Sequence, residues 1–176
     1  MRFTKALTGA LTLAGASTAP LTGAAKPATP GRETPRIERL FDLELQYEPG
    51  MAPVASAKGR EGKLLGSGTG RVEGPSLRGR VEWTLFEITA ARACKMNLAG
   101  FIQTDDGSRI PFETTGYGFV PDSRQPSRWN ANAALRFEAA SAGKYAWLSS
   151  LAAVWEGTID LDSGRHTYRA YAAAAK

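Results

Sequence analysis

Glu82 is the residue of this chain whose setting best suits chemistry. It lies within a segment of alternating apolar residues rather than in a turn, with Arg80 two positions before it and Trp83 next to it. A carboxyl group facing a protein interior needs a partner or holds its proton more strongly, and either condition suits proton transfer. We therefore predict that Glu82 acts as a catalytic acid or base. Strand geometry sends Glu82 and Trp83 to opposite faces, so both could line one cavity only at a bulge.

The other candidate residues would complete a small-molecule site. They comprise a predicted catalytic proton donor, two arginines that could hold an anionic group, three tryptophans as apolar walls and two acids as polar contacts: Tyr117, Arg80, Arg128, Trp83, Trp129, Trp147, Glu73 and Asp106. Glu73 and Asp106 each precede a glycine, so both are most simply interpreted as turn residues. Trp147 is most simply interpreted as a core residue.

Nucleophilic and metal chemistry have little support in the sequence. The chain has one cysteine, Cys94, and one histidine, His166, and it lacks a Gly-x-Ser-x-Gly segment. We interpret His166 as an exposed residue at the start of the last strand and Cys94 as a buried, inert thiol. The glycine-rich segment 66–70 continues into a strand rather than a helix, which favours a bend over a phosphate loop. We expect neither a metal nor a cofactor.

Length and composition are those of one globular domain. The 176 residues include 22% charged and 43% apolar residues, and the formal net charge is +5. Without the first 25 residues, 20 basic and 17 acidic residues remain, and the basic residues are scattered along the chain. Such a small, dispersed excess argues against nucleic-acid binding.

The N-terminus resembles a signal peptide. Arg2 and Lys5 precede a modestly apolar stretch that ends in small residues near position 25. This pattern predicts a signal peptide over 1–25, a flexible linker over 26–36, a folded domain over 37–172 and a short tail over 173–176. The expected location is the periplasm or outside the cell. No run of about 20 apolar residues predicts a membrane span.

The folded part has the period of β-strands rather than of helices. Apolar residues alternate with polar ones over 41–47 and 77–85, and further strands are predicted over 97–104, 109–119, 129–139, 148–160 and 166–171. Asp106-Gly107 predicts a hairpin turn, and Ala-rich segments such as 139–146 could form at most a turn or two of helix. We predict an all-β fold: a single closed or nearly closed antiparallel β-barrel of about eight strands with little helix.

Three segments resemble the landmarks of the domain-of-unknown-function family numbered 3237. They are Gly70 to Gly79, Gln103 to Ile110 and Tyr145 to Leu148, in that order. The resemblance implies two differences from the family pattern. The family has an Asp-Trp pair at the positions of Glu82 and Trp83, and it often has an Asn after Trp-Leu, at the position of Ser149. The resemblance spans about 41–171 and implies a small β-barrel, similar in shape to lipocalin and allene-oxide-cyclase barrels, with a central cavity.

Three functions fit these features. The first is a cofactor-free acid–base enzyme, an isomerase, cyclase or lyase (decarboxylation included), acting on a hydrophobic, for example aromatic, small molecule in the cavity. The alternative is an exported barrel that binds or carries such a molecule without catalysis. The third is a structural or self-associating domain, whose barrel would be filled by side chains and whose exposed apolar surface would be the functional feature.

Overall fold

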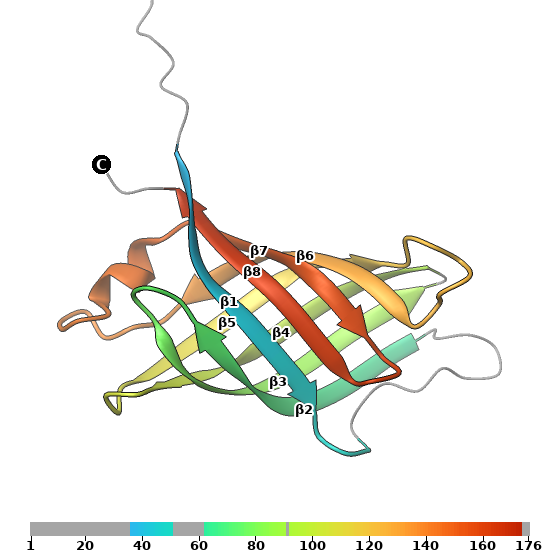
Figure 1. Ribbon diagram of the computed structural model, residues 1–176, viewed down its shortest axis with the longest axis horizontal. Helices are drawn as coiled ribbons and strands as arrows, with labels where there is room; N and C mark the ends of the chain where they lie inside the picture. Colours follow the sequence, from blue (N-terminus) through green and yellow to red (C-terminus); the bar gives the residue numbers. More distant parts are fainter. Residues whose placement is uncertain (1–35, 51–61, 91, 174–176) are drawn as a thin grey trace, which may run out of the picture. The chain divides into compact units, whose positions relative to one another are not determined.

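The chain forms a closed antiparallel β-barrel, which confirms the predicted fold (Figure 1). The computed structural model describes residues 36–50, 62–90 and 92–173, which belong to one compact unit, 34–176. Neighbouring strands pair in sequence order, and β8 closes the barrel onto β1. The elements are β1 (Ile37–Tyr47), β2 (Gly62–Glu73), β3 (Arg78–Ala90), β4 (Ala93–Thr104), β5 (Arg109–Phe119), β6 (Arg128–Phe137), the 3-10 turn η1 (Ala146–Ser150), β7 (Ala153–Asp160) and β8 (Arg165–Ala173).

Strand alternation places one set of side chains inside the barrel and the other in solvent. β3 alternates exposed and buried residues over its whole length, with Val81, Trp83 and Leu85 buried. The predicted turn at Asp106-Gly107 is present, and Gly107 has a φ of 87°, a conformation that glycine adopts without strain. The predicted strand over 148–160 is too long, because residues 146–150 form η1 and β7 begins only at Ala153.

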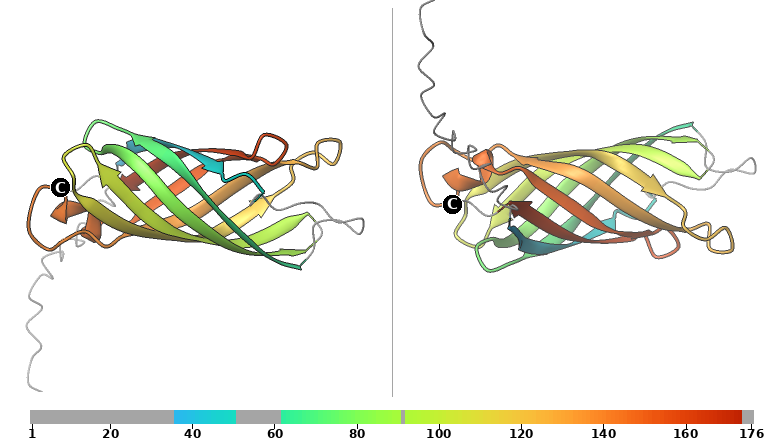
Figure 2. Two further views of the ribbon diagram at one scale, coloured as in Figure 1. Left: turned by 90° about the horizontal axis from the view of Figure 1, so that it is seen from below. Right: turned by 90° about the horizontal axis from the view of Figure 1, so that it is seen from above.

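The register of the strands gives the barrel a large stagger. If the paired residues are followed from Leu43 across β2 and β3, the path reaches Thr104 on β4. If they are followed from Leu43 around the barrel in the other direction, across β8, β7, β6 and β5, the path reaches Cys94 on β4, ten residues from Thr104. Such a stagger requires strongly tilted strands, visible in Figure 2. An eight-stranded barrel of this kind is just wide enough to be filled by side chains or to hold one small ligand.

One end of the barrel carries the connection between β6 and β7, which includes η1 (Figures 1 and 2). Leu148 of η1 is fully buried, and Tyr145 just before it is 8% exposed. The Ser149 hydroxyl donates to the Ala139 carbonyl (3.1 Å) and accepts from the Ala139 amide (2.9 Å), which fixes the connection at the end of β6. We call residues 138–152 the plug. No helix in the described part of the chain is long and apolar enough to cross a membrane.

Candidate functional site

Polar and aromatic side chains gather inside the barrel toward the end opposite the plug. They come from the last residues of β1 and β3, the first residues of β4 and β8, and adjacent inward positions. We call the following set the interior cluster: Tyr47, Trp83, Glu87, Thr89, Cys94, His166 and Tyr168, none more than 5% exposed. The plug end is apolar by contrast, with Phe41 and Phe137 in edge-to-face contact.

His166 lies at the centre of the ring contacts in the interior cluster. It is 0% exposed, and its ring centroid lies 4.8 Å from that of Tyr47 and 5.3 Å from that of Trp83. Its Nδ1 shares a hydrogen bond of 3.2 Å with the Tyr168 hydroxyl. The expectation that His166 is exposed is therefore wrong. The imidazole is therefore held between a phenol and aromatic rings and is enclosed by protein.

Glu87 brings an acidic group into the same interior. Its side chain is on the inward face of β3, is 1% exposed and accepts a hydrogen bond from the Thr89 hydroxyl (3.1 Å). Glutamate is rarely buried to this extent in proteins, because removing the charge from water costs several kcal/mol. A buried carboxyl beside other titratable groups is a common feature of catalytic sites.

Tyr168 stays protonated in this environment. Burial raises the pKa of its phenol well above 10, and the nearby ionisable groups of Tyr47, Cys94 and Glu87 raise it further. Its ring stacks on Trp155 with 4.6 Å between centroids and 12° between planes. The phenol therefore keeps its proton well above neutral pH.

The structure places Glu82 outside the barrel. On β3 the odd-numbered positions point inward, so Trp83 is buried while Glu82 and Arg80 are exposed on the outer face. No bulge interrupts the pairing of β3 with β2 or β4. Glu82 was predicted to line the cavity as an acid or base, and this predicted position is wrong. For the same reason Arg80 does not reach the interior.

The other predicted site residues divide between inside, outside and the plug. Trp83 and Trp129 are buried walls of the interior, as expected. The outward-facing residues of the predicted set are Tyr117, Arg128 and Glu73. Tyr117 is 61% exposed, and Trp147 is 36% exposed on η1, so neither lines the interior. These positions correct the predicted roles of Tyr117 as a donor, Arg128 as an anion clamp, and Glu73 and Trp147 as cavity residues.

Asp106 fixes the plug to the turn between β4 and β5. Its carboxylate accepts hydrogen bonds from Lys144 Nζ (2.8 Å), the Tyr145 hydroxyl (2.9 Å) and the Thr104 hydroxyl (2.6 Å). Lys144, Thr104 and Tyr145 hold the pKa of Asp106 well below 3.8, in that order of effect. Asp106, and then Tyr145, raise the pKa of Lys144 to about 12. These contacts assign Asp106 a structural role and do not bring it to the interior cluster.

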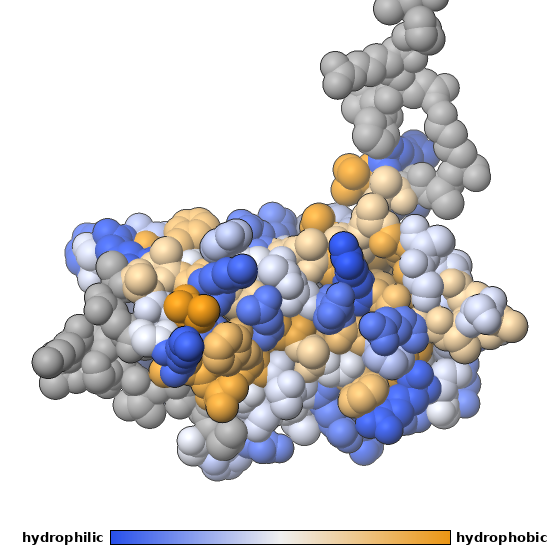
Figure 3. Space-filling view, turned by 180° about the vertical axis from the view of Figure 1, so that it is seen from behind, coloured by the Kyte–Doolittle hydropathy of each residue, from blue (hydrophilic) through white to orange (hydrophobic). Residues whose placement is uncertain are grey.

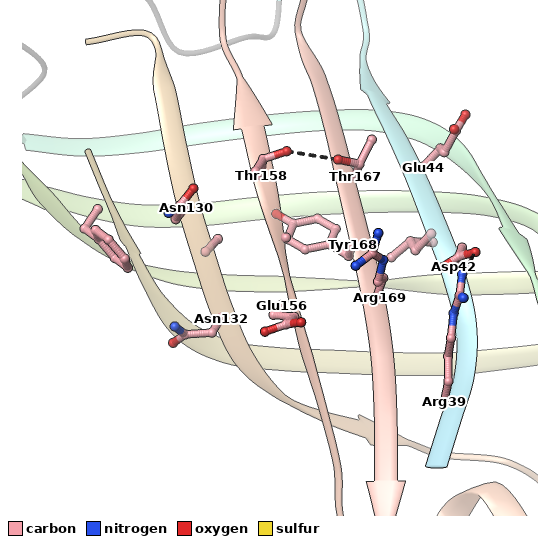
Figure 4. A pocket seen from close by; sticks show the side chains of 14 residues that line it. Arg39, Asp42, Glu44, Asn130, Asn132, Glu156, Thr158, Thr167, Tyr168 and Arg169 are labelled. Atoms are coloured by element: carbon pink, nitrogen blue, oxygen red, sulfur yellow. Dashed lines mark hydrogen bonds and ion pairs between the residues drawn. The ribbon is translucent and has the colours of Figure 1, made fainter. Parts of the chain in front are cut away.

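Two hollows lie on the outer wall of the barrel. One, of about 660 Å³, crosses β1, β8, β7 and β6 (Figure 4). Its polar side chains pair with one another, as in the hydrogen bond between Thr158 and Thr167 (3.0 Å) and the ion pair of Arg39 with Asp42. A second, of about 730 Å³, lies over β2 to β5 and includes Glu82.

Apolar side chains are exposed on the outer wall as well. Seen from behind, they gather toward one end of the barrel, between charged residues (Figure 3). Leu65 and Phe86, paired across β2 and β3, are 72% and 39% exposed. Within residues 36–50, 62–90 and 92–173, no group of three His, Cys, Asp or Glu side chains is placed to hold a metal.

The alternation of residues in the sequence already indicated that Glu87 and His166 face inward, but the prediction did not use it. Positions 81, 83 and 85 continue in period two to Glu87 and Thr89, so the pattern itself assigns both to the inward face. His166 and Tyr168 precede Ala170 and Ala172 in the same way on β8. His166 was expected to be exposed because it follows a turn at the start of a strand, although its position in the pattern indicated burial.

Fold and site together define a closed eight-stranded β-barrel with a polar and aromatic cluster buried in its interior. The chain belongs to the family DUF3237, described as proteins of unknown function, whose model matches residues 35–173. This match confirms the resemblance found in the sequence. No curated protein matches the chain.

Solved structures share the barrel at low sequence identity. A β-barrel-like protein of Acinetobacter baumannii is 21% identical with a TM-score of 0.65, over 81% of this chain and 99% of that one. A protein of unknown function from Clostridium acetobutylicum is 18% identical with a TM-score of 0.64, over the same shares. An enzyme from Penicillium herquei is 22% identical with a TM-score of 0.53, over 83% of this chain and all of that one. At these identities the likeness shows the fold alone.

Proposed function

We propose that the interior cluster carries out acid–base chemistry, without a cofactor, on a hydrophobic small molecule. The observation that carries this proposal is Glu87, a carboxyl group 1% exposed in the same interior as His166 and Tyr168. Isomerases, cyclases and many lyases need only a base, an acid and an apolar wall that excludes water. The sequence suggested the same reaction class but assigned it to Glu82.

The roles follow from charge and hydrogen bonding. Glu87 removes a proton from a carbon next to a carbonyl group, and the electron pair of that C–H bond moves toward the carbonyl oxygen to give an enolate. Glu87 then returns the proton at another atom, which restores the carboxylate. Tyr168, kept protonated by its surroundings and hydrogen-bonded to His166, keeps its own proton throughout. Trp83 supplies an apolar wall.

Exchange of hydrogen for deuterium tests the proposal before the natural substrate is known. The full chain is incubated in deuterated water with acetophenone, propiophenone and 1-tetralone, and loss of the α-proton signals is followed by NMR. Glu87→Gln should reduce any catalysed exchange by a factor of about 100 or more, the usual scale of a general base. Glu82→Gln, five residues along the same strand and exposed, is the matched control and should leave the rate unchanged.

Two results would contradict the proposal. Undiminished exchange in Glu87→Gln would remove the carboxyl from the mechanism, and loss of exchange only in Glu82→Gln would move the site to the outer hollow. Binding of these ketones with no exchange above the uncatalysed rate would favour the alternative, a barrel that binds or carries small molecules without turning them over.

A further inference from the structure

Two buried polar atoms beside the interior cluster have no hydrogen-bond partner among the described residues. They are Nε1 of Trp155 on β7 and the hydroxyl oxygen of Thr114 on β5. Trp155 is 1% exposed and Thr114 is 3% exposed. An unpaired buried donor or hydroxyl carries a desolvation penalty, so native proteins leave few of them. Two in one barrel interior point to a partner outside the chain.

Both atoms belong to the same part of the interior. The indole of Trp155 reaches from β7 toward β5, where it meets the ring of Phe112 edge-on with 6.2 Å between centroids. Thr114 is the next inward residue of β5 after Phe112. The other side of the indole stacks on Tyr168, which links this region to the interior cluster. The strand between them, β6, contributes Ala133, a small side chain opposite Trp155 in the register.

The chemistry of the two atoms defines what they can bind. The indole N–H of tryptophan only donates, and a threonine hydroxyl can donate as well. Each of them therefore suits an acceptor oxygen. The ring stacked on Tyr168 and the edge-on Phe112 favour a flat, aromatic or conjugated body attached to that oxygen.

The charge of the barrel interior indicates whether the ligand oxygen belongs to a carbonyl or to a carboxylate group. The one ionisable carboxyl group among the buried residues is Glu87, and no lysine or arginine of the described residues is buried with it. A carboxylate ligand would lie unpaired in a poorly solvated space that already holds an acid, which is strongly unfavourable. A neutral carbonyl oxygen has no such penalty.

We propose that Trp155 and Thr114 form the oxygen-binding end of the site, and that the ligand is a flat, neutral carbonyl compound rather than an acid. This inference rests on the proposed function for the position of the site. It reverses the expectation that arginine residues would hold an anionic group. It also assigns Thr114 and Trp155 as specificity-determining residues.

The first test needs no ligand. Thr114→Val removes the unpaired hydroxyl and keeps the shape of the side chain, so the melting temperature of the full chain should rise by about 2 to 4 °C. Thr115→Val is the matched control on the outer face of the same strand, where the hydroxyl donates to Asn97 (3.1 Å) and its loss should not stabilise the protein. A lower melting temperature for Thr114→Val would mean that its hydroxyl is already satisfied, and would overturn the inference.

The second test compares ligands that differ only in the oxygen. Acetophenone and α-methylstyrene have nearly the same shape, but only the first has an acceptor, and benzoate adds a charge. We expect acetophenone to bind most tightly to the wild type, measured by calorimetry. Thr114→Val and Trp155→Phe should each weaken acetophenone binding about 3- to 10-fold, the range of one neutral hydrogen bond, without affecting α-methylstyrene. Tighter binding of benzoate, or equal binding of acetophenone and α-methylstyrene, would contradict the inference.

The acid–base proposal and the oxygen-binding proposal can be refuted independently of each other. If Glu87→Gln abolishes exchange while Thr114→Val neither stabilises the protein nor weakens acetophenone binding, the acid–base site stands and the oxygen-binding assignment is wrong. If Thr114→Val behaves as expected and no exchange is catalysed, the barrel binds neutral carbonyl compounds and the catalytic proposal is wrong.

Discussion

Leu148 offers the sharpest test of the packing of the plug against the barrel. It is 0% exposed, while the serines that follow it in η1 are exposed. Replacing Leu148 with alanine removes buried carbon at about 0.8 kcal/mol per methylene group and leaves a cavity that adds to the loss. Together these effects predict a loss of about 3 kcal/mol in the free energy of unfolding, within the range measured for such substitutions.

The control is the same substitution at Leu65, which is 72% exposed on β2. Leu65→Ala should change the free energy of unfolding by less than about 0.5 kcal/mol, because its side chain is already in water. Urea unfolding of both full-length variants, followed by fluorescence, measures the difference. In a thermal scan Leu148→Ala should lower the melting temperature by about 6 to 12 °C. Equal effects at the two positions would contradict the packing of the plug against the barrel.

Two pH-dependent predictions follow from Asp106 and Tyr168. Asp106→Asn should lower the melting temperature at neutral pH; because the folded-state pKa of Asp106 is lowered from 3.8, the gap to the wild type should narrow as the pH falls below about 4. A gap as wide at pH 2 as at pH 7 would refute the ionic role of Asp106. Tyr168 keeps its proton in the folded state above pH 10 while the unfolded chain loses it, so the wild type should lose stability more steeply than Tyr168→Phe above that pH. Parallel stability curves for these two proteins between pH 9 and 11 would contradict the raised pKa.

Strand alternation made most of the fold predictable from the sequence. The period of two along 77–85 is sufficient to predict a half-buried strand, and the Asp106-Gly107 turn predicts the hairpin that follows β4. The plug was not predictable in the same way. Residues 148–152 resemble the start of a strand in sequence. Contacts made elsewhere hold this part of the chain outside the barrel wall: the Tyr145 hydroxyl with Asp106, and Ser149 with Ala139.

The site was less predictable because residue type and position gave opposite answers. Glu87 is an acid at an inward position and Glu82 is an acid at an outward one, and the strand that contains both was predicted to end at Leu85. His166 presented the same conflict at the start of β8. Local preferences fail most often where a protein retains polar groups in its core for a purpose other than stability, so such conflicts indicate functional residues.

Glu82 and Glu87, five positions apart on β3, therefore lie in two different chemical environments. On the outer wall, water solvates the carboxylate and weakens its interaction with any neighbour, to about 1 kcal/mol for two unit charges 4 Å apart. Inside the barrel the same separation is worth several times more, because the effective dielectric constant is lower. In the proposed function, a proton removed by Glu87 would therefore respond to the bound molecule rather than to bulk water. The plug and its apolar residues lie at the opposite end, so Glu87 and His166 belong to the end of the barrel where β1, β3 and β5 finish.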